Sequence, residues 1–134
     1  MKEILIDTHV FIYWLSNNTT LLGPNSRALL SSPANTVYVS SAVPWEISIK
    51  VARGSINFSG PITQNIYLCG FKPLSITPDH AEFAGALNPI HKDPFDRVMI
   101  AQSMLEGFDF MTRDRTIPQY TKIYSSLSLI DAST

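Results

Sequence analysis

The chain has 134 residues, is 45% hydrophobic and 16% charged, and carries a formal net charge of −1 at pH 7. This composition predicts one folded domain over residues 1–134, and the single cysteine, Cys69, excludes an intramolecular disulfide and a cysteine zinc cage. No apolar run approaches the roughly 20 residues that cross a bilayer, so we expect a cytoplasmic protein, and the near-neutral charge counts mildly against long duplex DNA as its ligand.

The chain begins with an apolar run followed by a run of helical periodicity. Residues 2–7, KEILID, predict a strand that ends on Asp7. A helix is expected over residues 8–16, with Thr8 as a candidate N-cap. The Gly-Pro pair that follows breaks the chain before a short helix over residues 25–32.

A second strand and helix follow. Residues 36–40, TVYVS, are β-branched and aromatic, as is typical of a strand. Ser41 is the expected N-cap of the next helix, which has Pro44 in its first turn and ends at Gly54.

The same alternation continues to the end of the chain. We expect helices over residues 61–70, 78–86 and 95–107, and strands over residues 72–77, 108–112 and 126–131. The polar loop NPIHKDP precedes the helix that begins near Phe95. Strands that alternate with helices predict a three-layer α/β/α domain with a mostly parallel central sheet.

Four acidic residues are candidates for one functional site: Asp7, Glu46, Asp96 and Asp114. Two of them follow predicted strands and two lie near the starts of predicted helices, and a parallel sheet places its ligand site beyond the carboxyl ends of its strands. Carboxylates that share a site repel one another, and a divalent cation relieves that repulsion. The pattern therefore predicts a Mg²⁺ or Mn²⁺ site that could activate water against a phosphodiester.

Each acid also has a purely structural interpretation. Asp7 could only cap a helix, and Glu46 lies four positions before Lys50, the spacing of an ordinary helix ion pair. Asp96 could serve the helix dipole, and Asp114 could occupy a turn. These alternatives stay open at the level of single residues.

Basic residues lie next to these acids along the chain: Lys50, Arg53, Arg97, Arg113 and Arg115. They could pair with the carboxylates when no metal is bound, or bind RNA phosphates when metal is present. A solvated charged surface is the plain alternative for each of them.

Four segments, in order along the chain, resemble motifs of the PIN-domain family: ILIDTHVFIYWL, SAVPWEISIKVARG, HKDPFDRVMIAQS and MTRDR. The resemblance covers nearly the whole chain and is closest to the VapC-type toxin ribonucleases of bacterial toxin–antitoxin pairs. It implies a PIN-like fold and RNA cleavage with one or two Mg²⁺ or Mn²⁺ ions.

The resemblance also assigns roles to residues. It matches four acids to the catalytic, metal-binding positions of the family: Asp7, Glu46, Asp96 and Asp114. Thr8 and Thr112 match threonines often found beside the first and last acids. It further implies a homodimer and a small VapB-like antitoxin whose C-terminal segment occupies the active-site groove.

The loop before residue 95 contains the main ambiguity. Pro94 places Asp93 at or before the helix N-cap, so we assign Asp96, and not Asp93, to the metal. His91 is interpreted as a loop histidine without a special partner, with RNA binding as the alternative. We interpret the other two histidines, His9 and His80, as helix-surface residues. A supporting role beside Asp7 stays open for His9.

The aromatic residues near the N-terminus have two interpretations. Phe11, Tyr13 and Trp14 could stack on bases, but packing or dimer contact is the more common role for an aromatic helix. Trp45, next to Glu46, is interpreted as a core residue.

Other α/β enzymes that begin with an aspartate after a strand fit less well. A haloacid-dehalogenase phosphatase needs a second aspartate where this chain has His9, and the paired acids of a receiver domain are absent. Two alternatives remain open: a PIN-like RNA-processing nuclease without an antitoxin, and a PIN-like scaffold that binds RNA or a partner without cutting.

Overall fold

The computed structural model describes residues 1–134. The strands are β1 (Glu3–Ile6), β2 (Thr36–Ser40), β3 (Lys72–Leu74), β4 (Asp109–Thr112) and β5 (Ser128–Asp131). The helices are α1 (Thr8–Leu15), α2 (Pro24–Ser31), α3 (Ala42–Ala52), α4 (Ile62–Leu68), α5 (Pro78–Ala86) and α6 (Pro94–Glu106), with a 3₁₀ segment, η1, over Ile117–Lys122. None of these helices has the length and apolarity to cross a membrane.

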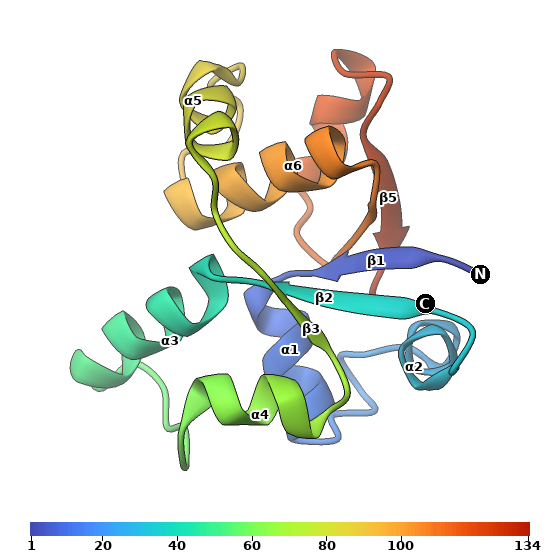
Figure 1. Ribbon diagram of the computed structural model, residues 1–134, viewed down its shortest axis with the longest axis vertical. Helices are drawn as coiled ribbons and strands as arrows, with labels where there is room; N and C mark the ends of the chain where they lie inside the picture. The colour runs from blue at the N-terminus through green and yellow to red at the C-terminus, as the bar shows by residue number, and fades with distance from the viewer.

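The five strands form one sheet in the order β3-β2-β1-β4-β5, and every neighbouring pair is parallel. Helices α5 and α6 and segment η1 lie on one side of the sheet, and α1, α2 and α4 lie on the other (Figure 1). This confirms the predicted three-layer α/β/α architecture. The central strand β1 is covered on both faces, so Ile4, Leu5 and Ile6 are all completely buried.

The strand order reverses direction at β1. The chain moves outward through β2 and β3 on one side of β1, then returns to place β4 and β5 on the other side. The carboxyl ends of β1 and β4 therefore flank the point where the order switches, which is where open α/β sheets bind their ligands. Asp7 follows β1 directly, and Asp114 lies two residues after β4.

One predicted helix cap is wrong, and a second is correct in position but makes no side-chain capping bond. Thr8 is the first residue of α1, and Asp7 is its cap: Asp7 Oδ1 accepts a hydrogen bond from the Val10 N–H at 2.8 Å. At α3 Ser41 is the N-cap residue, as expected, but its side chain makes no capping bond, and its hydroxyl donates to the Leu74 carbonyl. Ser40 Oγ instead accepts from the Ala42 N–H at 3.0 Å.

The expected strand over residues 72–77 is shorter than predicted. Strand β3 is at the edge of the sheet and pairs only with β2, over Lys72–Leu74. The other expected elements are present, with boundaries that shift by a few residues at most.

Candidate metal centre

Asp7 is a buried carboxylate held by uncharged groups. Its side chain lies at the carboxyl end of β1 and the residue is only 3% exposed. One oxygen accepts from the Val10 N–H, and the other accepts from the Thr112 hydroxyl at 2.6 Å. The same threonine oxygen accepts from the Asp114 N–H at 3.0 Å, so Thr112 links the ends of β1 and β4. No cation of the chain forms an ion pair with Asp7.

The first turn of α6 supplies Asp96, and Asp93 caps that helix. Asp93 Oδ1 accepts from the Phe95 N–H at 2.9 Å and from the Asp96 N–H at 3.4 Å. The capping role expected for Asp93 is confirmed, with Pro94 as the first helical residue. Asp93 also lies near enough to His91 and Asp96 that one ligand atom from each falls within 4.8 Å of the others.

Asp114 begins the turn that leads into η1. Its Oδ1 accepts from the Thr116 N–H at 2.7 Å and from the Ile117 N–H at 3.2 Å. Its Oδ2 faces the Asp96 side and lies 3.8 Å from the His91 Nε2 atom. The turn role considered for Asp114 is therefore present, and it leaves one oxygen available to the cluster.

Glu46 approaches the same region from α3. It is 3% exposed, and its Oε1 accepts from the Thr8 hydroxyl at 2.5 Å. Its Oε2 lies 2.8 Å from the Lys50 Nζ atom, which is the ion pair considered from the spacing. Thr8 therefore connects α1 to Glu46 in place of capping its own helix.

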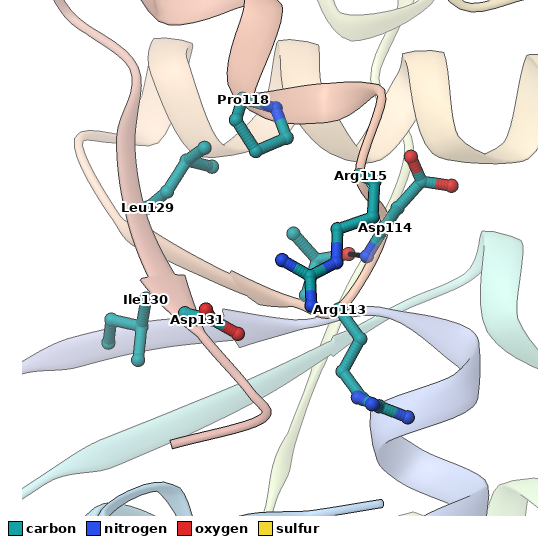
Figure 2. Close-up of a pocket in the computed structure, with 8 residues that line it drawn as sticks. Arg113, Asp114, Arg115, Pro118, Leu129, Ile130 and Asp131 are labelled. Carbon is teal, nitrogen blue, oxygen red and sulfur yellow. Dashed lines mark hydrogen bonds between the residues drawn. The ribbon is translucent and has the colours of Figure 1, made fainter.

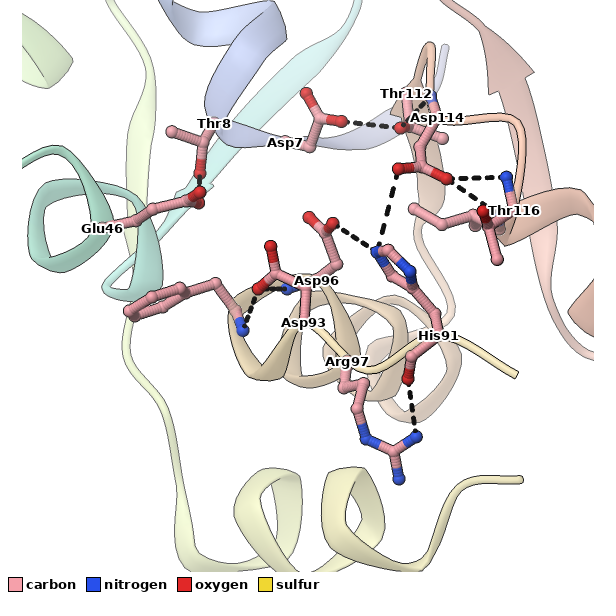
Figure 3. A network of polar contacts seen from close by, with 12 residues as sticks. Asp7, Thr8, Glu46, His91, Asp93, Asp96, Arg97, Thr112, Asp114 and Thr116 are labelled. Carbon is pink, nitrogen blue, oxygen red and sulfur yellow. Dashed lines mark hydrogen bonds and ion pairs between the residues drawn. The ribbon is translucent and has the colours of Figure 1, made fainter. Parts of the chain in front are cut away.

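The carboxylates face a common space. Figure 3 shows Asp96 and Asp114 both directed toward His91, with the Asp7 carboxylate turned toward Thr112 and Glu46 beside Thr8. A cavity of about 190 Å³ is lined by three of the acids and their neighbours: Asp7, His9, Tyr13, Asp96, Arg113 and Asp114. Glu46 lies outside that lining, in an adjoining hollow that contains three cations: Lys50, Arg53 and Lys92.

The shared environment raises the pKa of two carboxyls. Burial raises the pKa of Asp7, against the lowering effect of the Thr112 hydroxyl. Burial, with the nearby charges of Asp93 and Asp7, raises the pKa of Asp96 to about 7, although the hydrogen bond with His91 lowers it. Both shifts mean that the ionised carboxylates are poorly compensated by the chain itself.

These residues fit a divalent cation. Three carboxylates from different elements present oxygen atoms to one polar cavity, and oxygen is the donor that Mg²⁺ and Mn²⁺ take in proteins. A bound cation would also supply the positive charge that Asp7 lacks. Asp7, Asp96 and Asp114 are the residues that could hold it, and Glu46, outside the cavity lining, lies close enough to Asp7 for its charge to contribute to the raised pKa of Asp7.

His91 is the residue that the sequence interpretation missed. It was expected to have no special partner, but its Nε2 atom lies 2.7 Å from Asp96 Oδ2 (Figure 3). Its five-residue separation from an acid in the first turn of a helix could have suggested the contact. The loop geometry that makes the contact was not readable from the sequence.

Arg97 and Arg113 differ sharply in surroundings. The Arg97 guanidinium donates to backbone carbonyls, among them Ala84 and Leu87, both at 2.8 Å, and His91 at 3.0 Å. It therefore holds loops together and does not join the acidic cluster. Arg113 lines the cavity, and its Nε atom is buried without a hydrogen-bond partner.

A smaller pocket lies on the other side of the turn after β4. Figure 2 shows Arg115 extending into this pocket, above Asp131, while the Asp114 carboxylate points away from it and Arg113 runs toward α1. Arg115 and Arg113 both help to lower the pKa of Asp131, whose hydrogen bonds with Ser133 are the larger cause. Arg115 therefore serves a different surface from the acidic cavity.

Two other interpretations are wrong and one is confirmed. Trp45 is not in the core: it is 60% exposed and packs edge-on against Phe95. His80 is not on the surface: it is 2% exposed, closes the capping box of α5 with Thr77, and contacts Glu106. Phe11 is completely buried, which confirms its packing role.

Comparisons with known proteins identify the family and the fold of the chain. The PIN domain family matches residues 4–123. A chain of VapBC2 from Rickettsia felis, solved bound to a DNA fragment from its promoter, has a TM-score of 0.64 and 17% identity over 96% of this chain and 97% of that one. No curated protein matches the sequence significantly.

Two further solved structures have the same fold. For VapBC-5 from Mycobacterium tuberculosis, the TM-score is 0.62 and the identity 16%, over 97% of this chain and 98% of that one. For VapBC-1 from nontypeable Haemophilus influenzae, the TM-score is 0.61 and the identity 17%, over 98% of this chain and 99% of that one. The structural likeness establishes the fold, and the family match over most of the sequence establishes the membership: the chain belongs to the PIN domain family.

Proposed function

We propose that this protein is a Mg²⁺- or Mn²⁺-dependent endoribonuclease and the toxin of a toxin–antitoxin pair. The observation that supports this most directly is the convergence of Asp7, Asp96 and Asp114 on one cavity at the switch point of the sheet. Membership of the PIN domain family and the shared fold with toxin–antitoxin proteins support the same assignment.

The proposed chemistry is the attack of water on an RNA phosphodiester. When bound, the cation lowers the pKa of a water ligand and offsets the charge that develops on the phosphoryl oxygens. Asp7, Asp96 and Asp114 would hold the cation. The Thr112 hydroxyl and the Val10 N–H position Asp7, and the Thr116 N–H positions Asp114. Glu46, fixed by Thr8, either completes the ligand set or orients the water.

The cations around the cavity suggest how RNA is held. Arg113 has an unpartnered Nε and lines the cavity, so it is the residue best placed to bind a phosphate near the scissile bond. The adjoining hollow with Lys50, Arg53 and Lys92 offers positive charge for the neighbouring phosphates. Tyr13 lines the cavity as well and can stack against a base.

The proposed partners follow from the proteins that share the fold. The solved relatives include toxin–antitoxin complexes, so a small antitoxin that covers the acidic cavity is the expected protein partner. We also propose a homodimer. Light scattering on the purified protein, alone and with the product of a neighbouring short reading frame, tests both assemblies.

The experiment that tests the chemistry is cleavage of a labelled RNA pool by the wild-type protein with Mg²⁺, with Mn²⁺ and with EDTA. We expect cutting with either cation, none with EDTA, and fragments with 5′-phosphate and 3′-hydroxyl ends. A DNA strand of the same sequence is the control for substrate class. Cutting in EDTA, or fragments with 2′,3′-cyclic phosphate ends, would contradict cation-dependent hydrolysis by water.

A further inference from the structure

The imidazole of His91 points into the acidic cluster and not toward solvent. Its Nε2 atom lies 2.7 Å from Asp96 Oδ2 and 3.8 Å from Asp114 Oδ2 (Figure 3). The histidine therefore presents one nitrogen to two of the three carboxylates that line the cavity. Its side chain is 17% exposed, much like the 16% of Asp96.

The backbone of His91 is held in place by residues outside the cluster. Its N–H donates to the Tyr120 hydroxyl at 2.8 Å, and its carbonyl accepts from an Arg97 Nη atom at 3.0 Å. Tyr120 is completely buried, and Arg97 is tied to the Ala84 and Leu87 carbonyls. The backbone that carries the imidazole is therefore fixed by Tyr120 and Arg97, independently of the contact with Asp96.

The donor atoms form a mixed set. His91, Asp93 and Asp96 can each offer one ligand atom within 4.8 Å of the other two, and Asp93 uses only Oδ1 to cap α6. Asp114 adds an oxygen that lies 3.8 Å from the same Nε2 atom. Imidazole nitrogen is a good ligand for transition-metal ions, whereas Mg²⁺ takes oxygen almost exclusively.

We propose that His91 Nε2 is a ligand of the divalent cation, together with Asp96 and Asp114, and that it makes the site prefer Mn²⁺ to Mg²⁺. This inference rests on the proposed metal centre and adds a nitrogen to a ligand set otherwise made of carboxylates. A metal-binding role for His91 also explains why Tyr120 and Arg97 both form hydrogen bonds with its backbone.

The test is pulsed electron paramagnetic resonance of the Mn²⁺-loaded protein, which detects nitrogen bound directly to the ion. We expect ¹⁴N modulation in the wild type and its replacement by ¹⁵N modulation in protein labelled with ¹⁵N-histidine. His91→Gln should remove the signal. The matched control is His9→Gln, because His9 is the histidine that lines the same cavity; it should keep the signal.

Calorimetric titration gives a second measurement. His91→Gln should weaken Mn²⁺ binding by at least about tenfold, the usual cost of disturbing a metal site, and weaken Mg²⁺ binding less. Bound Mn²⁺ without any nitrogen modulation in the wild type would overturn the role of His91 and leave the carboxylate centre standing. If the wild type binds Mg²⁺ but no Mn²⁺, this inference alone fails; if it binds neither cation, the proposed function fails as well.

Discussion

At the scale of single residues, Thr112 positions the Asp7 carboxylate that lines the cavity. Its hydroxyl donates to Asp7 at 2.6 Å and its oxygen accepts from the Asp114 N–H, so one side chain positions two proposed ligands. That hydroxyl also lowers the pKa of Asp7 against the effect of burial.

We expect Thr112→Val to weaken Mn²⁺ binding by about tenfold, because the substitution removes an orienting hydrogen bond behind the ligand and raises the pKa of Asp7 further. Thr112→Ser keeps a hydroxyl and is the matched control. Calorimetry at pH 7.5 compares the two variants. Equal affinities for the valine and serine variants would show that the hydroxyl does not matter.

Substitutions of Arg113 and Arg97 should separate an effect on RNA binding from an effect on the stability of the fold. Arg113→Ala should weaken RNA binding and reduce the salt dependence of that binding by about 0.7, the value for one phosphate contact on a single strand. Arg97→Ala should leave that salt dependence unchanged. Both are measured in the Asp7→Asn background, so that the RNA is not cut.

For Arg97→Ala we expect the free energy of unfolding to fall by about 2 kcal/mol, because several partly buried carbonyls lose a charged donor. Urea unfolding measures the change. If Arg113→Ala proves the less stable variant, with RNA binding intact, the roles assigned to the two residues are reversed.

At the scale of the elements, the C-terminal residues are fastened to the start of α2. The Gly23 N–H donates to the Ala132 carbonyl at 2.9 Å, and the Asn25 N–H donates to Thr134 at 2.8 Å. A Cβ atom at Gly23 would lie 2.2 Å from the Thr134 carbonyl carbon. The absence of a side chain at residue 23 therefore permits this attachment.

Gly23→Ala should lower the free energy of unfolding by about 1–3 kcal/mol, because the new methyl group forces the two segments apart. Gly85→Ala is the control: its Cβ would meet nothing within 4 Å, and it lies within α5, where alanine is the better helix former. It should be neutral or stabilising. Thermal unfolding that ranks the two variants in the opposite order would contradict the packing at Gly23.

The elements were predictable because their signals are local. Alternation of β-branched runs with helical runs predicts the α/β class, and the strand ends predict where Asp7 and Asp114 lie. The order of the strands has no local signal. Residues whose surroundings come from distant elements were misjudged for the same reason: Trp45 needed the position of α6, and His91 needed Tyr120, 29 positions away.

At the scale of the whole molecule, the metal-free protein contains two buried carboxyls, Asp7 and Asp96, whose ionisation lowers the stability of the fold. Burial is the largest cause of the raised pKa of both Asp7 and Asp96. A pKa raised on folding adds stability below the unfolded value, near 3.8, and that stability is lost as the pH rises through the folded value, about 7 for Asp96.

The metal-free protein should therefore unfold at a lower temperature at pH 8 than at pH 5. The loss should be about 1 kcal/mol or more, or roughly 4 °C in Tm, and saturating Mn²⁺ should restore it. Asp96→Asn should reduce the pH dependence, since the amide does not titrate. Thermal unfolding in EDTA across this range is the measurement. A Tm that rises steadily from pH 5 to 8 would contradict the raised pKa values of Asp7 and Asp96.

The most direct test of the central claim compares RNA cutting by the wild type, Asp7→Asn and Asp109→Asn, each with Mn²⁺ and with EDTA. Asp109 begins β4 at the opposite end of the sheet, so its variant controls for the loss of a carboxylate as such. The account predicts metal-dependent cutting by the wild type and Asp109→Asn, and a loss of about 100-fold or more for Asp7→Asn. Equal cutting by Asp7→Asn would contradict the assignment of the acidic cavity as the catalytic centre.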